Sequence, residues 1–255
     1  MSALRARCPD CRTFTAVAVG PDYECHSCGR EFKAGLVRVP RAWGKGGEKM
    51  AEGAALGVPY PETGSVLHDS LEGQSAELAS VLPERPLVLG GCCCSHVGAV
   101  RGLSARHERL AVVWIDAHGD LNTPETSPSG NEWGMPLRML LDAGVVSPGR
   151  VALVGARNLD PPEVEYLAET GIDDSLDRAL ADAGAVYVAL DLDVLDPEEA
   201  DVFMPEPDGL RVAAVEDILR DTAVRGTIVG VGVTGFLQKE RNVRVVTRLL
   251  AAAGL

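Results

Sequence analysis

Aromatic residues are scarce in this chain of 255 residues, where Phe, Trp and Tyr together make up 4%. The strands of an all-β sandwich usually carry more aromatic residues, so this composition favours close-packed α/β layers. No hydrophobic run approaches the ~18 residues that a membrane-spanning helix needs. No charged and then apolar secretory leader opens the chain either. We therefore expect a cytoplasmic protein with no membrane contact.

Basic residues are also in the minority, because 24 Lys and Arg stand against 37 Asp and Glu, a formal net charge of −13. This excess of acid argues against a surface that binds nucleic acid, whose phosphates attract Lys and Arg. Residues 1–45 differ, since eight bases and four acids give them +4 and leave −17 for the remainder. For this first segment, docking or oligomer contact is at least as well supported as nucleic-acid binding. The 46% of hydrophobic residues supplies a core and excludes global disorder.

The seven cysteines form two clusters, and their odd number in a chain without a leader indicates a reducing compartment. Four of them make a C-x2-C-x13-C-x2-C pattern, which lets four thiolates converge tetrahedrally on one Zn²⁺. So short a segment buries little core, and metal affinity has to supply its folding free energy. We predict a zinc ribbon over residues 1–38 with one structural Zn²⁺. Its ligands are Cys8, Cys11, Cys25 and Cys28.

The second predicted domain, residues 50–255, alternates short hydrophobic runs with longer amphipathic ones, a pattern typical of α/β domains with a parallel sheet. Residues 38–64, rich in Gly and Pro, are interpreted as linker and loop. The predicted strands are Leu87–Gly90, Leu110–Asp116, Arg150–Gly155, Val186–Asp191 and Thr227–Val233. The predicted helices are Leu71–Leu82, Ser95–Arg106, Pro136–Ala143, Pro162–Thr170, Leu176–Ala183, Val212–Arg220 and Val243–Ala253.

Metal-binding side chains follow three of these strands, at the carboxyl ends where open α/β sheets place their sites. A single Asp after a strand is usually a turn or cap residue, but two acid-rich patches are harder to explain in that way. Packed carboxylates repel one another, so a cation should lie among them. Carboxylates with one imidazole suit Mn²⁺ or a similar divalent ion, and there are enough ligands for two. The candidates are Cys93, Asp116, His118, Asp120, Asp191 and Asp193.

Three motifs make the chain resemble the ureohydrolase family of arginase, agmatinase and formiminoglutamase, from Val66 to Leu255. In that family a three-layer α/β/α domain holds two Mn²⁺ ions bridged by hydroxide. The hydroxide attacks the carbon of a small cationic guanidino or amidine compound and releases urea or formamide. The resemblance also implies a homo-oligomer, a trimer or hexamer. The motifs are Gly90–Cys94, Asp116–Asn131 and Leu190–Pro197.

The resemblance assigns a role to each metal-binding residue. It makes Asp116 and Asp191 bridging ligands, while Asp120 completes the set of one ion. His118 and Asp193 complete the set of the other ion. These five residues are also the expected catalytic centre.

Four further residues occupy positions where arginase-like members hold the substrate. Asn122, Ser129 and Asn131 match the positions that bind the α-carboxylate. Asp160 matches the one that binds the α-ammonium. Each also has a simpler interpretation, because Asn, Ser and Asp next to Pro or Gly are common turn formers.

The chain departs from the family pattern at its first metal-binding motif. Cys92 and Cys93 stand where the family has Asp and then His. A thiolate is a softer ligand than imidazole and shifts preference from Mn²⁺ towards Zn²⁺ or Fe²⁺. His96, one helical turn further on, is the rival ligand. We favour Cys93 because the spacing fits without a gap, and we expect Cys94 only to pack in the core.

Two more departures concern the substrate. Trp133 replaces the histidine credited with moving protons to the leaving amine, and it can stack on a planar cation or close the pocket. Glu132 can take over the proton transfer only if it faces inward. Gly230–Phe236 lacks the acid that anchors the guanidinium in arginases, which argues against arginine itself. The preferred hypothesis is a binuclear metallohydrolase of a linear C–N bond. The alternative is a non-catalytic metal-binding relative that acts as a sensor or binds a partner through its ribbon.

Overall fold

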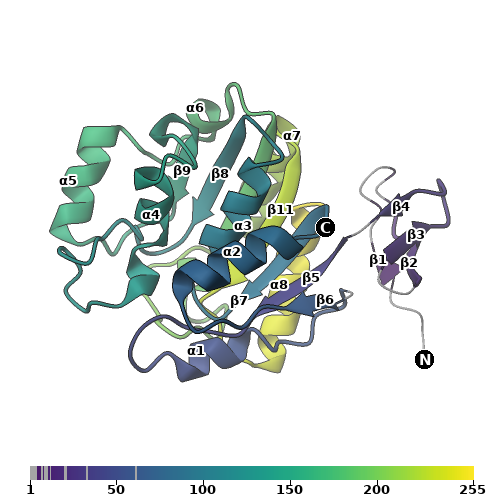
Figure 1. Ribbon diagram of the computed structural model, residues 1–255, viewed down its shortest axis with the longest axis horizontal. Coiled ribbons are helices and arrows are strands. Elements are labelled where there is room, and N and C mark those ends of the chain that lie inside the picture. Colours follow the sequence, from purple (N-terminus) through teal and green to yellow (C-terminus); the bar gives the residue numbers. More distant parts are fainter. Residues whose placement is uncertain are drawn as a thin grey trace.

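Figure 1 shows the computed structural model, which describes residues 5–6, 8, 11, 13–19, 22–32, 34–60 and 62–255. The predicted ribbon also covers residues 1–4, 7, 9–10, 12, 20–21 and 33, which lie outside the described residues. The described chain contains a small antiparallel sheet and a larger α/β unit. No helix in these ranges is long and apolar enough to cross a membrane.

The larger unit is built on a seven-stranded sheet in the order β6-β5-β7-β11-β10-β8-β9, and every pairing in it is parallel. The predicted α/β class and parallel sheet are therefore confirmed. Each predicted strand is present, with its ends moved by at most two residues. The strands are β5 (Ala34–Val39), β6 (Glu62–Ser65), β7 (Arg85–Gly90), β8 (Leu110–Ile115), β9 (Val151–Val154), β10 (Ala185–Asp191) and β11 (Ile228–Thr234).

Helices cover both faces of this sheet and make three layers (Figure 1). Side chains alternate along each strand, so Val112 and Trp114 of β8 face one layer while Val113 and Ile115 face the other. The first layer holds α2 (Leu71–Val81), α3 (Ser95–Ser104), α4 (Pro136–Asp142) and α5 (Pro161–Thr170). The second holds α6 (Leu176–Leu180), α7 (Val212–Arg225) and α8 (Glu240–Ala252).

Each of the seven predicted helices is present in its place, but not every end agrees. α7 runs five residues beyond its predicted end, and α8 begins three residues earlier than expected. α6 ends at Leu180, before the predicted Ala183. Three short turns of 3-10 helix are also present: η1 (Glu132–Gly134), η2 (Pro148–Arg150) and η3 (Leu192–Val194).

The predicted linker over residues 38–64 is wrong, because part of it is regular structure. It contains the end of β5, the helix α1 (Glu48–Gly53) and most of β6. β5 lies between β6 and β7 in the large sheet, so residues 34–38 belong to this sheet and not to the small unit. β6 reads Glu-Thr-Gly-Ser and has no hydrophobic residue that could have signalled a strand.

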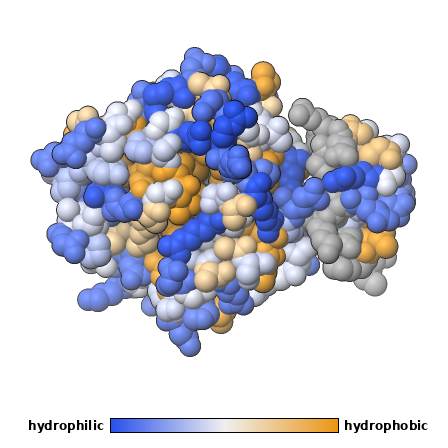
Figure 2. Space-filling model, turned by 45° about the horizontal axis from the view of Figure 1, so that its top comes forward, coloured by the Kyte–Doolittle hydropathy of each residue, from blue (hydrophilic) through white to orange (hydrophobic). Residues whose placement is uncertain are grey.

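The small unit carries four short antiparallel strands in the order β1-β2-β3-β4. Figure 2 shows this unit beside the larger one. The face of the larger unit that is visible there is mostly hydrophilic, and a hydrophobic area lies in a hollow of that face. Only Cys8, Ala16, Tyr23 and Cys25 form the buried cluster of the small unit among the described residues. So little buried surface agrees with the expectation that a metal supplies its folding free energy. The strands are β1 (Arg5–Ala6), β2 (Ala16–Val19), β3 (Asp22–Cys25) and β4 (Glu31–Phe32).

Candidate metal centre

Four adjacent strands, β7, β11, β10 and β8, end at one edge of the sheet and bring the predicted ligands together. Cys93 follows β7, Asp191 is the last residue of β10, and Asp116 comes directly after β8. The strands are buried on both faces, so their ends are held in fixed positions. The predicted convergence of these side chains at the carboxyl edge of the sheet is what the structure contains.

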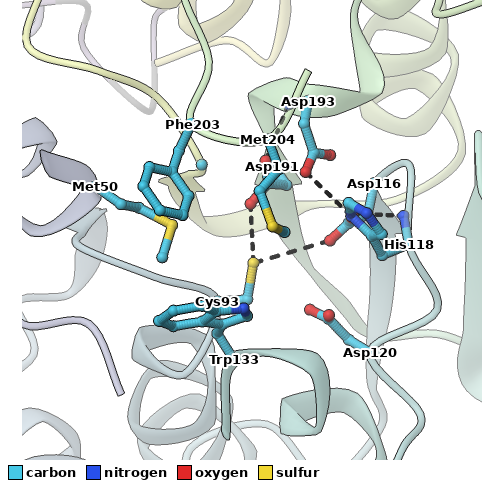
Figure 3. Close-up of a pocket in the computed structure, with 11 residues that line it drawn as sticks. Met50, Cys93, Asp116, His118, Asp120, Trp133, Asp191, Asp193, Phe203 and Met204 are labelled. Atoms are coloured by element: carbon cyan, nitrogen blue, oxygen red, sulfur yellow. Dashed lines mark hydrogen bonds and ion pairs between the residues drawn. The ribbon is translucent and has the colours of Figure 1, made fainter. Parts of the chain in front are cut away.

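A pocket opens over these strand ends (Figure 3). It encloses about 290 Å³ of empty space, part of which is open to solvent. Carboxylates, a thiol and an imidazole line it together with large apolar side chains, of which Met50 and Phe203 lie across Cys93 from His118 and Asp120. The lining residues are Met50, Cys93, Asp116, His118, Asp120, Trp133, Asp191, Asp193, Phe203, Met204 and Gly235.

Two groups of three potential ligands share one residue. Cys93, Asp116 and Asp120 form the first group, and Asp116, His118 and Asp193 form the second. Within each group, one atom from every residue lies within 4.8 Å of the others. Asp116 therefore lies between two potential ion positions, which is the arrangement that a binuclear centre requires.

Asp191 contacts the first group through Cys93. The Cys93 thiol donates to Asp191 Oδ2 at 2.9 Å, and the Thr234 hydroxyl donates to the same oxygen at 3.0 Å. The other oxygen, Oδ1, accepts the backbone N–H of Asp193 at 2.9 Å. Gly235 has a φ of +72° and packs so closely that a Cβ atom there would overlap the Asp191 carboxylate. The end of β11 thus fixes the position of Asp191.

The carboxylates raise one another's pKa values. Burial, followed by the charge of Asp193, raises the pKa of Asp191 to about 7. Burial, followed by the charge of Asp116, raises the pKa of Asp193 to about 6 and that of Asp120 well above its usual range. So many buried acids remain ionised together at neutral pH only if positive charge compensates them.

Among the described residues that line this pocket, His118 is the one with an imidazole side chain. Burial alone lowers its pKa, but hydrogen bonds to Asp116 and Asp193 raise it to about 12. Its Nδ1 lies 3.1 Å from Asp193 Oδ2 and 3.5 Å from Asp116 Oδ1, and its Nε2 lies 3.4 Å from Glu206 Oε1. Nδ1 therefore points to the carboxylates, while Nε2 points to Glu206.

Glu206 was not predicted to take part in the site. It lies in a Pro-Glu-Pro sequence that resembles the family loop, which was the available signal. Its Oε1 accepts a hydrogen bond from Asn158 Nδ2 at 2.9 Å, and its backbone carbonyl accepts one from Arg157. The loop thus holds this carboxylate against the far side of the His118 ring.

His96, the rival ligand, lies behind the pocket. Its Nδ1 is 2.9 Å from the Tyr187 hydroxyl, its Nε2 is 3.3 Å from Thr234 Oγ1, and its ring packs edge-on against Trp114. Both ring nitrogens thus have partners within the protein, and burial lowers the pKa of His96 to about 3. Cys93 lines the pocket and His96 does not, so the geometry favours Cys93. Cys94 is buried as expected.

The donor set fits a pair of divalent cations. Asp120 Oδ2 is buried and has no hydrogen-bond partner among the described residues, although a buried carboxylate oxygen needs one. The backbone of Asp120 has a φ of +53°, an uncommon conformation for a residue other than Gly. An ion at the Cys93, Asp116 and Asp120 position would satisfy this oxygen.

Of the five predicted substrate-binding residues, Trp133 lines the pocket and the other four do not. Asn122 Nδ2 donates to Asp160 Oδ2 at 2.8 Å, and Asn122 Oδ1 accepts from the Thr126 hydroxyl at 2.9 Å. Asn131 Oδ1 accepts the backbone N–H of Lys45, and Ser129 Oγ accepts that of Asn131. Their role in substrate binding stays a prediction.

Glu132 precedes Trp133 in η1 and does not line the pocket. Its Oε2 is buried without a hydrogen-bond partner among the described residues. Its role in proton transfer stays a prediction. Of the apolar side chains that line the pocket, Trp133 was predicted from the sequence, whereas Phe203, Met204 and Met50, which lies in the segment interpreted as linker, were not.

The four cysteines of the small unit also come together. Their sulfur atoms lie within 4.8 Å of one another. Cys8 Sγ is 3.6 Å from Cys28 Sγ, and Cys11 Sγ is 3.5 Å from Cys25 Sγ. The pKa of Cys25 is lowered to about 5, mainly by a hydrogen bond from Thr15. A lowered pKa favours the thiolate form, which is the form that binds a metal. The geometry is that of a four-thiolate site.

A family model described as the arginase family matches residues 55–252. Among curated proteins, arginase from Bacillus subtilis is 40% identical over 144 residues, which cover 45% of this chain and 48% of that protein. Arginase from Staphylococcus aureus is 37% identical over 142 residues, which cover 45% and 47% of the two chains. The matched part thus spans about half the length of these relatives.

Solved structures of arginases share the fold. The Bacillus caldovelox arginase superimposes with a TM-score of 0.74 at 25% identity, over 86% of this chain and 97% of that one. The Bacillus cereus arginase gives 0.76 at 24% identity, over 87% and 98%. The formimidoylglutamase of Bacillus subtilis gives 0.69 at 16% identity, over 87% and 85%.

Proposed function

The chain belongs to the arginase family, and on that premise we propose that it hydrolyses a linear C–N bond in a guanidino or formimino compound with the help of two divalent ions. One observation carries the proposal: Asp116 is shared by two groups of buried ligands at the ends of adjacent strands. Its relatives in sequence are named arginases, and a formimidoylglutamase shares its fold.

In this proposal Asp116 and Asp191 bridge the two ions. Cys93 and Asp120 complete one set of ligands, and His118 and Asp193 complete the other. Bound there, the ion pair supplies Lewis acidity that lowers the pKa of a shared water and stabilises charge on the attacked carbon. Mn²⁺ is the ion expected from the family, with Zn²⁺ or Fe²⁺ favoured at the position where Cys93 ligates.

The side chains of the pocket define what the protein itself contributes. The buried carboxylates attract a cationic amidine or guanidinium group, and the ring of Trp133 offers a flat face to its plane. The apolar wall excludes water from the other side of the group. Proton delivery to the leaving amine by Glu132 stays a prediction, because its buried Oε2 lacks a partner among the described residues but Glu132 does not line the pocket.

The test is an assay for released urea or formamide with Mn²⁺, Zn²⁺ or Fe²⁺. The substrates are arginine, agmatine, guanidinobutyrate, guanidinopropionate, formiminoglutamate and alkylguanidines. Asp116→Asn and Asp191→Asn should abolish turnover, whereas Asp217→Asn, at an exposed position on α7, should not. Inert protein with a full metal complement in every assay would contradict the proposal.

A second candidate function is a non-catalytic metal-binding relative that senses a ligand or binds a partner through the small unit. It is favoured by Trp133, which lines the pocket where the family has a titratable histidine, and by the lack of an acid in β11. Turnover of any guanidine that Asp191→Ala abolishes would remove this candidate.

For the small unit we propose one structural Zn²⁺, bound by Cys8, Cys11, Cys25 and Cys28. The convergence of the four sulfur atoms supports it. Cys25→Ser should lower the zinc content by one ion per chain and leave the ions of the pocket in place. Ser27→Ala, which changes a neighbouring residue and keeps all four thiols, is the matched control and should retain the zinc. A homo-oligomer, trimer or hexamer, stays a prediction.

A further inference from the structure

Four large apolar side chains line the pocket together with the carboxylates and form its apolar wall. Met50 comes from α1, Trp133 from η1, and Phe203 and Met204 from the loop after η3. In Figure 3, Met50 and Phe203 lie on one side of Cys93, and His118 and Asp120 lie on the other. A ligand whose cationic end faces the carboxylates therefore places the rest of its structure against this wall.

The wall is packed in a defined position. Trp133 and Phe203 meet edge to face, with their ring centroids 6.1 Å apart. A Cβ atom at Gly44 or at Gly47 would overlap the Trp133 ring, so the segment before α1 lies directly against it. Trp133 is 8% exposed and Met50 is 4% exposed. The indole thus has little room to move away from a bound ligand.

Apart from the candidate ligand His118, groups that could bind a negatively charged tail are missing from the described part of the lining. Among the described residues, the lining contains no Lys or Arg, no Asn or Gln and no hydroxyl side chain. An α-carboxylate buried there would lose its hydration without gaining a partner, a large unfavourable change. An alkyl or aryl tail would lose only unfavourable contact with water.

The residues expected to hold an amino-acid head group are engaged elsewhere. Asn122 uses both ends of its amide on Asp160 and Thr126, and Asn131 accepts from the backbone of Lys45. Asn122 and Asp160 are joined to each other by a 2.8 Å hydrogen bond, and neither side chain lines the pocket.

We propose that the substrate is an amidine or guanidine with a short, uncharged, apolar tail, and that Trp133, Phe203 and Met50 determine this specificity. This inference rests on the proposed function and names the substrate class of the same pocket. The planar cation lies between the acid-rich side and the indole face, and the tail lies along the methionine and phenylalanine side chains.

The test compares compounds that differ in their tails: n-butylguanidine, 4-guanidinobutyrate, agmatine and arginine. The metal-loaded full chain should process n-butylguanidine with a kcat/KM at least about tenfold higher than that for the other three. Calorimetry should give the same order of Kd values. It should also give a negative heat-capacity change for n-butylguanidine, since apolar surface is buried.

Phe203→Lys places a cation in the wall and should reverse the order in favour of 4-guanidinobutyrate, while Phe203→Leu should keep the original order. Circular dichroism checks that both variants fold, and Met204→Lys replaces Phe203→Lys if that variant does not. Trp133→Leu should weaken the binding of every guanidine and keep their order.

The outcomes separate this inference from the proposed function. Faster turnover of arginine, agmatine or 4-guanidinobutyrate than of n-butylguanidine by the unmodified chain overturns the inference and leaves the proposed function standing. Tight binding of n-butylguanidine without turnover supports the inference and counts against the proposed hydrolysis. No binding and no turnover of any of the four compounds overturns both.

Discussion

The thiol of Cys93 donates a hydrogen bond to Asp191 Oδ2 at 2.9 Å, within the acid-rich end of the sheet. Burial, followed by the charge of Asp191, raises the pKa of Cys93 well above its usual range. A cation bound here therefore has to displace the thiol proton, so metal binding releases a proton. We therefore expect the identity of residue 93 to control both which metal binds and how its affinity depends on pH.

Cys93→His should change the metal preference of the centre. Imidazole is a harder ligand than thiolate, so the ratio of Mn²⁺ to Zn²⁺ affinity should rise, by about tenfold or more. Competition titrations monitored by elemental analysis measure this ratio. Co²⁺ bound in the pocket, with the four-cysteine site kept filled by Zn²⁺, provides a second readout, because a thiolate ligand gives a charge-transfer absorption that Cys93→His should lack. Cys94→Ser, which keeps Cys93, should retain the absorption, and an unchanged spectrum in Cys93→His would show that Cys93 is no ligand.

Chelator-treated protein should lose stability as the pH rises from about 4 to about 7. The folded pKa of Asp191 is about 7, against an ordinary value of 3.8. Between these two pH values the folded state holds a proton that the unfolded chain has released. The stability that this bound proton provides is lost as the pH rises through the folded pKa. Asp193, at about 6, acts in the same direction.

Melting temperatures across this range measure the effect. The fall should be smaller in Asp191→Asn, which cannot ionise at that position, and Asp217→Asn is the matched exposed control. Saturating metal should reverse the trend, because ionised carboxylates are its ligands. Equal slopes for the unmodified chain and Asp191→Asn would contradict the explanation.

Gly235→Ala should remove the metal centre without touching a ligand. A Cβ atom at this position would overlap the carboxylate of Asp191, which would have to move. Gly254→Ala is the matched control, because its φ of +79° is close to the +72° of Gly235, but a Cβ atom there would meet only Arg85 Nη2, at 3.9 Å. Both variants should lose about 1 kcal/mol of stability through backbone strain. Only Gly235→Ala should also lose metal, as elemental analysis would show.

Glu206→Ala should weaken metal binding although Glu206 lies outside the two ligand groups. Its Oε1 is 3.4 Å from His118 Nε2. At this position Oε1 can accept a hydrogen bond from a protonated Nε2, which leaves Nδ1 free to bind an ion. Loss of such a partner typically costs about 10-fold to 100-fold in metal affinity. Glu206→Gln keeps an acceptor oxygen and should lose much less. Equal affinities in both variants and the unmodified chain would rule out this role.

The ligand residues were predictable from the sequence because they depend on local features. Asp116 and Asp191 end buried hydrophobic runs, and parallel strands bring such ends to one edge. The order of the strands was not predictable, because residues far apart in the chain pair to form it. Knowing that order would have placed Thr234 beside Asp191.

Apart from Trp133, the apolar wall could not be predicted, and neither could Glu206, for a different reason. Met50 and Phe203 reach the pocket from a short helix and a loop, whose positions depend on tertiary packing. Methionine and phenylalanine carry no pattern that separates a pocket wall from an ordinary core position. Their role is visible only when the whole lining is in place.

Only residue 33 separates β4 of the small unit from β5 of the large sheet. β5 pairs on both sides, with β6 and β7, and its Val39 accepts a hydrogen bond from Gly91, two residues before Cys93. A deletion ending at residue 38 would thus remove a strand from inside the sheet as well as the four-cysteine unit. Shortened versions that begin at Ala34 would keep this strand, and they would separate the contribution of the small unit from that of the strand supporting Cys93.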